Sequence, residues 1–218
     1  MMKVGIIAPI KFLRKYCITN IQYCLPSLLE ESKGYREFYL ERQRMGNIVI
    51  LDCKKISWRR EPEDLELVKK VLTYLKPTYI ILPSYMYSVD LTIMVAKEYS
   101  RKLKGNFIGC LEGTTLRETK KCAKNLKLAQ YAIPSHLFNI CKGYFKEGIF
   151  IENHSSIDEF IGSDGILVTS LPVRLGLQGR LLSDDKPSPP SLTFHEDEDR
   201  YPTVTRRNVE EAIDFYEE

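Results

Sequence analysis

Short, wholly apolar segments alternate along this chain with segments of helical spacing, and this alternation constrains the fold more than any other feature. The apolar segments predict seven β-strands, at residues 4–8, 48–51, 79–82, 107–111, 129–133, 148–151 and 166–168. Helices are predicted between and around them, at residues 35–45, 63–75, 91–103, 116–126, 137–145 and 156–161. Because strands that are apolar throughout are covered on both faces, the pattern indicates a parallel sheet inside a layer of helices.

Two arrangements fit this alternation: a closed (β/α)8 barrel and an open doubly wound sheet. In a dinucleotide-binding doubly wound sheet, the first strand leads into a glycine-rich turn. Here it leads into the glycine-free stretch at residues 8–11, so we predict a compact, single-domain α/β barrel of the TIM type over residues 1–218. An irregular loop is expected at residues 185–203, with the eighth strand near residues 192–194. A closing helix at 204–216 should face inward with Val209, Ala212, Ile213 and Tyr216.

The predicted helix at residues 116–126 has a recognisable start. Thr115 stands at the N-cap position and Glu118 follows three residues later. This spacing is that of a capping box, in which the two side chains satisfy backbone N–H groups that the first helical turn leaves without partners.

Composition and charge exclude several classes of protein. Hydrophobic residues make up 44% of the chain, yet no apolar run approaches the ~18 residues that a membrane helix needs, so no membrane association is expected. Pro9, Lys11 and Arg14 interrupt the first apolar run, which therefore indicates a strand rather than a signal peptide, and a cytoplasmic protein. The net charge of +3 is too close to balance to indicate nucleic-acid binding by itself.

The cysteines and histidines predict neither a metal site nor a cofactor. Six cysteines occur without a Cys-x-x-Cys pair, and the three histidines show no paired spacing. We expect Cys53 and Cys110, at the ends of predicted strands, to be small buried hydrophobes in a reducing compartment.

In a barrel of this type, the functional site lies at the carboxyl ends of the strands. Asp52 and Glu112 are the clear carboxylates at the ends of early strands, and such a pair suits general acid/base catalysis or recognition of nucleobase N–H groups. A helix N-cap or an ion pair is the alternative explanation for each. Other candidate ligand-binding residues at strand ends are Lys11, Ser84, Tyr85, Tyr87, Gly113, Thr169 and Ser170.

Tyr85 and Tyr87 follow the third predicted strand closely. Their rings could stack on a base, and packing against the next helix is the alternative.

The segment after the last predicted strand is basic and contains two glycines. Arg174 and Arg180 could each present a planar donor fork to a phosphate or carboxylate, and Gly176 and Gly179 would let the backbone approach a ligand. An ordinary surface loop is the alternative interpretation.

Several phrases of the sequence occur in a recognisable order. They are IAPIKFLRKYC, YCLPSLLEES, YREFYLER, GNIVILDC, PTYIILPS, FIGCLEGTTLRETKKCAKNL, YAIPSH and GILVTSLPVRLGLQG. In this order the chain resembles the tRNA-guanine transglycosylase superfamily, and most of all its short, phage-associated relatives similar to DNA-guanine transglycosylases. The resemblance implies a barrel that cleaves an N-glycosidic bond of guanosine with an aspartate nucleophile and then installs a 7-deazaguanine.

Matched residue by residue, this resemblance implies lost catalysis. The position of the family's nucleophilic aspartate falls on Val168, and that of its base-recognising aspartate falls on Ser84. The glutamine of its Gln-Gly motif falls on Glu112. Of the family's carboxylates at these positions, Asp52 is the one that this sequence retains, and Arg174 matches the loop after the nucleophile. The zinc cysteines of the larger tRNA enzymes are absent from the sequence.

Two functions from different classes follow. The favoured one is a degenerate, transglycosylase-like barrel, or pseudoenzyme, that binds a nucleobase or nucleotide, for example a phage protein that sequesters a nucleotide signal in the host cytoplasm. The alternative is an active pentosyltransferase or N-glycosidase that acts on guanine-type bases in DNA, RNA or nucleotides, with Asp52 or Glu112 as the catalytic group. Nucleic acid is a further candidate partner. A third interpretation is an unrelated barrel whose mouth binds another small anion.

Overall fold

Eight parallel strands form a closed barrel in sequence order. The computed structural model describes residues 2–56, 61–141, 144, 147–152, 164–169 and 202–217. The strands are β1 (Met2–Ile6), β2 (Ile21–Cys24), β3 (Ile48–Asp52), β4 (Tyr79–Ile81), β5 (Phe107–Cys110), β6 (Tyr131–Pro134), β7 (Glu147–Glu152) and β8 (Asp164–Thr169). The last strand pairs with the first from Met2 opposite Gly165 to Ile6 opposite Thr169, which closes the sheet. The predicted (β/α)8 barrel is therefore confirmed.

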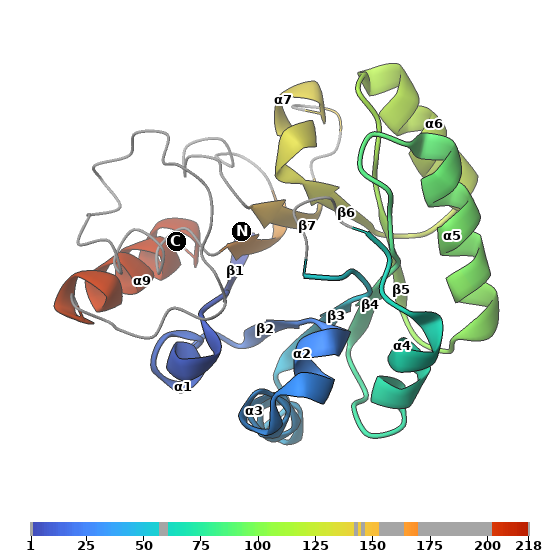
Figure 1. Cartoon of the computed structure of the whole chain (residues 1–218). Helices are drawn as coiled ribbons and strands as arrows, with labels where there is room; N and C mark the ends of the chain where they lie inside the picture. The colour runs from blue at the N-terminus through green and yellow to red at the C-terminus, as the bar shows by residue number, and fades with distance from the viewer. Residues whose placement is uncertain are drawn as a thin grey trace.

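Helices surround the barrel (Figure 1). The described elements are η1 (Ile10–Phe12), α1 (Leu13–Tyr16), α2 (Pro26–Glu31), α3 (Lys33–Arg44), α4 (Leu65–Leu72), α5 (Val89–Lys102), α6 (Leu116–Leu126), η2 (Ser135–Leu137), α7 (Phe138–Cys141) and α9 (Pro202–Glu217). The predicted helices at 35–45, 63–75, 91–103 and 116–126 correspond to α3, α4, α5 and α6. The one predicted at 156–161 lies outside the described residues. Within the described part of the chain, no helix is long and apolar enough to cross a membrane.

The position of one strand was predicted wrongly. The eighth place in the barrel belongs to β2, between β1 and β3, whereas residues 192–194 lie outside the described part of the chain. A polar residue, Gln22, interrupts the apolar pattern of β2 and hides the strand. Its side chain is fully buried, and its Nε2 donates to the carbonyl oxygens of Cys17 and Thr19. A buried amide is tolerated where local carbonyls accept its hydrogen bonds.

The closing helix and the capping box follow the sequence closely. Val209 and Ala212 of α9 are buried, and Ile213 packs against the core, while the side chain of Tyr216 lies outside the described part of the structure.

At the start of α6, the Thr115 hydroxyl accepts from the Glu118 N–H. The Glu118 carboxylate accepts from the N–H and hydroxyl of Thr114, one residue earlier than in the usual capping box, and these bonds hold the pKa of Glu118 below its usual value.

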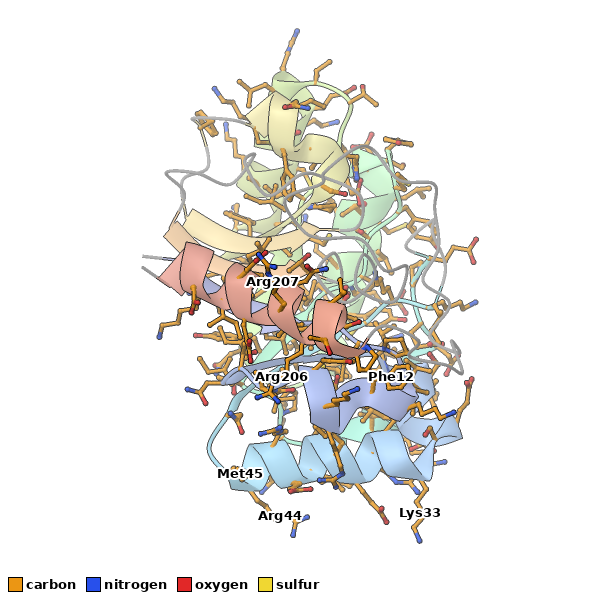
Figure 2. The ribbon with its side chains drawn as sticks, turned by 90° about the vertical axis from the view of Figure 1, so that its left-hand side faces the viewer. Phe12, Lys33, Arg44, Met45, Arg206 and Arg207 are labelled. Atoms are coloured by element: carbon orange, nitrogen blue, oxygen red, sulfur yellow. The ribbon has the colours of Figure 1, made fainter. Side chains whose placement is uncertain are left out.

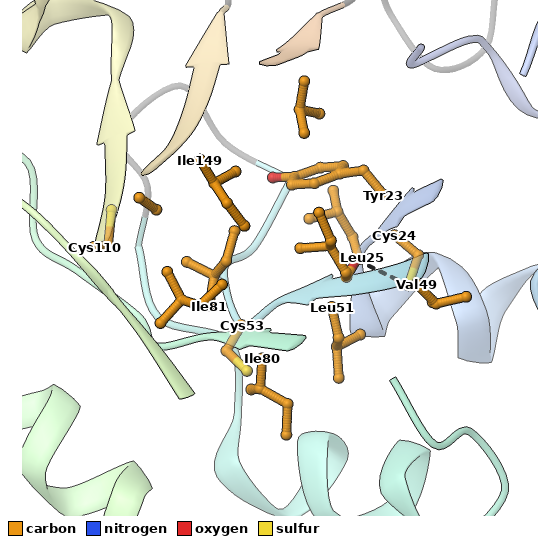
Figure 3. Close-up of a cluster of buried hydrophobic side chains, with 14 of the residues drawn as sticks. Tyr23, Cys24, Leu25, Val49, Leu51, Cys53, Ile80, Ile81, Cys110 and Ile149 are labelled. Atoms are coloured by element: carbon orange, nitrogen blue, oxygen red, sulfur yellow. Dashed lines mark hydrogen bonds between the residues drawn. The ribbon is translucent and has the colours of Figure 1, made fainter. Parts of the chain in front are cut away.

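The core is continuous from the barrel interior to the helices. Figure 3 shows part of it, with Tyr23, Leu51, Ile81 and Ile149 from four strands close together. All six cysteines are free thiols and buried. Burial raises the pKa of Cys17 to about 12 and that of Cys122 to about 11, so both stay protonated near neutral pH.

On the outer surface, Glu30 joins α2 to α4. Its carboxylate accepts from the Tyr74 hydroxyl at 2.7 Å, after the end of α4, and lies 2.5 Å from the Lys70 Nζ within α4. The Arg36 guanidinium of α3 lies over the Tyr74 ring. The hydrogen bonds from Lys70 and Tyr74 lower the pKa of Glu30, so its ionised form stabilises the folded state.

We expect the thiols to be unreactive in the folded protein. At pH 8, a thiol with the pKa of Cys17 is thiolate in roughly one molecule in 10⁴, and thiolate is the reactive form. A chromogenic disulfide reagent should react slowly with native protein and reveal six thiols in denaturant. Rapid reaction of even one thiol in the native state would contradict the burial described here.

We expect Glu30→Gln to lower the free energy of unfolding by about 1 kcal/mol at pH 7, a modest amount because Lys70 is exposed. The pKa of Glu30 is depressed on folding, so its contribution is complete above the unfolded value near 4.5 and is lost as the pH falls through the folded value. Urea denaturation of both proteins between pH 3 and pH 8 should show the difference shrinking below about pH 4.5. A difference independent of pH would contradict this.

Candidate functional site

The carboxyl ends of the parallel strands meet at one end of the barrel, which we call the mouth. Four predicted site residues lie there, Asp52 at the end of β3, Ser84 after β4, Glu112 after β5 and Thr169 at the end of β8. All four are buried. Buried polar groups at this end of the barrel are the expected location of binding or catalysis.

Glu112 is the centre of the described part of the mouth. It is completely buried. One carboxylate oxygen accepts from the Ser84 hydroxyl at 2.9 Å, and the other accepts from the Tyr87 backbone N–H at 3.1 Å and lies 3.1 Å from the His136 Nε2. The four residues, which we call the Glu112 cluster, come from the ends of β4, β5 and β6. These partners compensate the carboxylate for the loss of water.

His136 belongs to this site and was not among the predicted site residues. It lies in η2, two residues after the proline that ends β6, and its side chain is 16% exposed. A carboxylate only accepts hydrogen bonds, so the geometry assigns the proton to Nε2 and leaves Nδ1 of the neutral ring as an acceptor. The signal in the sequence was a histidine directly after a strand end, but a lone histidine on a loop is usually just exposed.

A tight turn presents Tyr87 at the mouth. The turn is closed by a hydrogen bond of 3.0 Å from the Ser88 N–H to the Tyr85 carbonyl. The Thr92 hydroxyl of α5 accepts from the Tyr85 N–H and donates to the Tyr85 carbonyl. Within this turn Tyr87 has a φ of 63°, in the left-handed region, which costs a non-glycine residue about 1 kcal/mol or more. Its bond to Glu112 holds it there.

The Tyr87 side chain is 57% exposed, and its ring meets that of His136 edge to face, with centroids 5.1 Å apart. Tyr85 is instead partly buried against the core, so packing against the next helix, the alternative to stacking on a base, fits it better.

Gly113 has a φ of 147°, and a Cβ there would come within 3.0 Å of the Thr119 nitrogen. It therefore lets the chain pass close to the start of α6.

A second buried carboxylate, Asp52, accepts from the Tyr23 hydroxyl of β2 at 2.5 Å. The Tyr39 hydroxyl of α3 donates in turn to the Tyr23 carbonyl at 2.6 Å. Burial first, and then the negative charge of Asp52, raise the pKa values of the neighbouring Cys24 and Cys53. Asp52 is thus part of a buried network that joins β2 and β3 to α3.

The remaining predicted site residues are only partly described. Lys11 lies exposed on η1, after β1. Val168 is completely buried in β8. Ser170, Arg174, Gly176 and Arg180 lie outside the described residues. Within the described part of the chain, no group of three or more His, Cys, Asp or Glu side chains is arranged to hold a metal ion.

Fold and site together define a (β/α)8-barrel protein with buried polar residues at its mouth. No protein-family model matches the chain, and no curated protein matches it. Several solved structures are similar to this chain in fold. N-acetylneuraminate lyase from Mycoplasma synoviae has a TM-score of 0.53 at 12% identity, over 100% of this chain and 98% of that one.

Two further solved structures are similar. The YdjI aldolase from Escherichia coli K12 has a TM-score of 0.55 at 11% identity, over 99% of this chain and 89% of that one. D-psicose 3-epimerase from Clostridium cellulolyticum H10 has a TM-score of 0.50 at 12% identity, over 99% and 98%. At such low identity these likenesses establish the barrel fold alone.

The backbone strain at Tyr87 leads to a prediction. We expect Tyr87→Gly to be more stable than Tyr87→Ala by about 1 kcal/mol, because only glycine adopts a φ of 63° without cost. Leu91, exposed in α5, is the control. There alanine should be the more stable by about 1 kcal/mol, as in any helix. Urea denaturation of the four variants measures both differences, and alanine being preferred at both positions would show that Tyr87 is not strained.

Proposed function

We propose that the mouth binds a nucleobase or nucleotide and that the protein is a transglycosylase-like barrel that holds this ligand without exchanging its base. The observation that supports this most is the Glu112 cluster. A buried carboxylate accepts from the backbone N–H of Tyr87 and contacts His136, and the exposed Tyr87 ring packs against the His136 imidazole. Backbone strain that surrounding residues maintain is typical of ligand sites.

The two rings suit a planar heteroaromatic ligand. An exposed tyrosine ring offers a stacking face, and stacking of a base on an aromatic side chain is worth about 1–3 kcal/mol. The Nδ1 of His136 can accept from a ring or exocyclic N–H of a purine. Glu112 holds the backbone of Tyr87 and the imidazole of His136 in place before the ligand arrives, which lowers the entropic cost of binding.

In this proposal Glu112 acts through its neighbours. The sequence suggested that it accepts directly from the N–H groups of a base. In the structure both of its oxygens accept from Ser84, Tyr87 or His136, and the side chain is completely buried. Its role is therefore to position Tyr87 and His136.

The residue at the nucleophile position favours binding over catalysis. Val168 is apolar and buried in β8, whereas a transglycosylase needs a carboxylate to attack the sugar carbon. Losing that charge should cost several kcal/mol of barrier, or roughly a thousandfold in rate. The six buried free thiols fit a reducing compartment such as the cytoplasm, which is the host cytoplasm if a phage encodes the protein.

One observation favours the alternative, an active pentosyltransferase or N-glycosidase. A histidine that contacts a buried carboxylate is a common general acid/base arrangement. In that case His136 would transfer a proton to or from the base during cleavage, and Glu112 would orient it.

We expect the protein to bind guanosine 5′-monophosphate intact, as measured by calorimetry and by mass spectrometry of the recovered nucleotide. Tyr87→Gly, which keeps the turn, and His136→Gln should each weaken binding roughly tenfold, from lost stacking and a lost acceptor. Tyr144→Ala is the control because Tyr144 is also an exposed tyrosine, 52% exposed, outside the Glu112 cluster.

Absence of binding, or equal effects of all three substitutions, would contradict the proposed site. Release of free guanine over many turnovers, abolished by His136→Gln, would instead establish the enzymatic alternative.

A further inference from the structure

Two neighbouring helices carry an excess of positive charge that the whole-chain balance hides. Residues 97–127 contain nine Lys or Arg and three Asp or Glu, a net +6, while the whole chain is +3. The rest of the chain is therefore −3. The nine basic residues are all exposed, and we call them the basic face: Lys97, Arg101, Lys102, Lys104, Arg117, Lys120, Lys121, Lys124 and Lys127.

Most of the basic face lacks a carboxylate partner. Lys102 pairs with Glu98 and Lys121 pairs with Asp90, while the Lys120 Nζ lies 3.7 Å from the centre of the Tyr144 ring. Among the described residues, no ion pair involves the other six: Lys97, Arg101, Lys104, Arg117, Lys124 and Lys127.

Several cations on other helices of the protein have carboxylate partners. In α9, Arg206 pairs with Glu210 and Arg207 with Glu211, each one turn further along. In α3, Lys33 lies 3.7 Å from a carboxylate four residues on. Figure 2 shows this side of the molecule, with Arg206, Arg207 and Lys33 on its surface. Paired charges of this kind are what an ordinary solvated helix carries.

Helix dipoles do not explain the basic face either. Cations are favourable in the last turn of a helix, which accounts for Arg101 and Lys102 of α5 and for Lys124 of α6. Arg117 lies in the first turn of α6, where the dipole disfavours a positive charge. Lys97 and Lys120 lie in helix interiors, beyond the reach of the effect.

The basic face extends to the far end of the barrel from the mouth. Helices α5 and α6 pack side by side on the outside of the barrel (Figure 1). Each helix runs back against the direction of its strand, so its C-terminal end lies at the end opposite the mouth. The cations of α5 lie between Lys97 and Lys102, in the C-terminal half of the helix, a rise of roughly 8 Å, which matches about two to three phosphates of one strand at roughly 3.4 Å per nucleotide.

We propose that the basic face binds the sugar-phosphate backbone of a nucleic acid, independently of the mouth and of base identity. Unpaired cations on two packed helices form an electrostatic surface for phosphates, whose binding releases counterions. An anionic membrane fits less well, because interfacial helices also insert large apolar side chains. Every residue of 97–127 is described, and none of them is an exposed large hydrophobic residue. The exposed Leu91 and Met94 precede the first cation of α5, and the exposed Tyr144 ring lies under the Lys120 ammonium group.

The test is binding of a fluorescent 20-base-pair duplex of mixed sequence, as DNA and as RNA, measured by anisotropy from 25 to 300 mM salt. We expect binding that weakens linearly in log–log form with a slope of about −3 to −5. The triple variant Lys97→Glu, Arg101→Glu, Lys124→Glu should lose at least tenfold in affinity at low salt and reduce the slope by roughly 3.

A control with the same change in net charge separates a local surface from overall charge. Lys33→Glu, Arg44→Glu, Arg206→Glu alters three exposed residues of the face in Figure 2 and should lower affinity much less than the first triple variant. Circular dichroism and thermal unfolding confirm that both variants fold. Should the first one unfold, Lys124→Gln alone is used, with an expected loss of about twofold or more and a slope change of roughly 1.

Three outcomes would overturn the proposal: no binding of either duplex at 25 mM salt, equal losses in the two triple variants, or binding only to vesicles of phosphatidylserine and phosphatidylcholine. Guanosine 5′-monophosphate binding should be unchanged in the basic-face variants, so failure here and failure at the mouth are distinguishable.

Discussion

The arrangement of the mouth depends on the cost of burying a carboxylate. An isolated ionised carboxylate inside a protein loses several kcal/mol of hydration free energy, and hydrogen bonds must restore it. Glu112 obtains them from a side-chain hydroxyl, a backbone N–H and an imidazole, which follow β4 and β6, the two strands on either side of β5. Each partner is thereby held in one position. The same bonds that stabilise the buried charge therefore determine the shape of this part of the mouth.

Rigid elements support this arrangement on both sides. The turn that carries Tyr87 is fixed to α5 by the Thr92 hydroxyl and to β5 by Glu112. The close passage at Gly113 brings the end of β5 against the start of α6. A left-handed tyrosine can persist only where such contacts outweigh its strain. The contacts thus maintain backbone strain at a residue whose ring is exposed and contributes little to the core. For this reason we connect the Tyr87 ring with ligand binding.

The sequence predicts those helices and strands whose local residue pattern agrees with their place in the barrel. Wholly apolar strands and the Thr115 cap of α6 are determined by neighbours in the sequence, so the barrel and most helix bounds could be predicted. β2 could not, because Gln22 is compatible with a buried strand only through carbonyl partners on the preceding loop. Likewise, Glu112 was found as a carboxylate at a strand end, whereas His136 becomes significant only once folding places it 3.1 Å from Glu112.

The mouth and the basic face favour different ligands. At the mouth, Asp52 and Glu112 are buried carboxylates, and a carboxylate favours N–H donors such as those of a base, directly or through the groups that it orients. The basic face attracts phosphate and has no described polar pocket to recognise a base. The nine exposed cations of the basic face should therefore direct a polyanion toward α5 and α6 by long-range attraction. A nucleobase at one end and a nucleic-acid backbone at the other are therefore compatible on one small barrel.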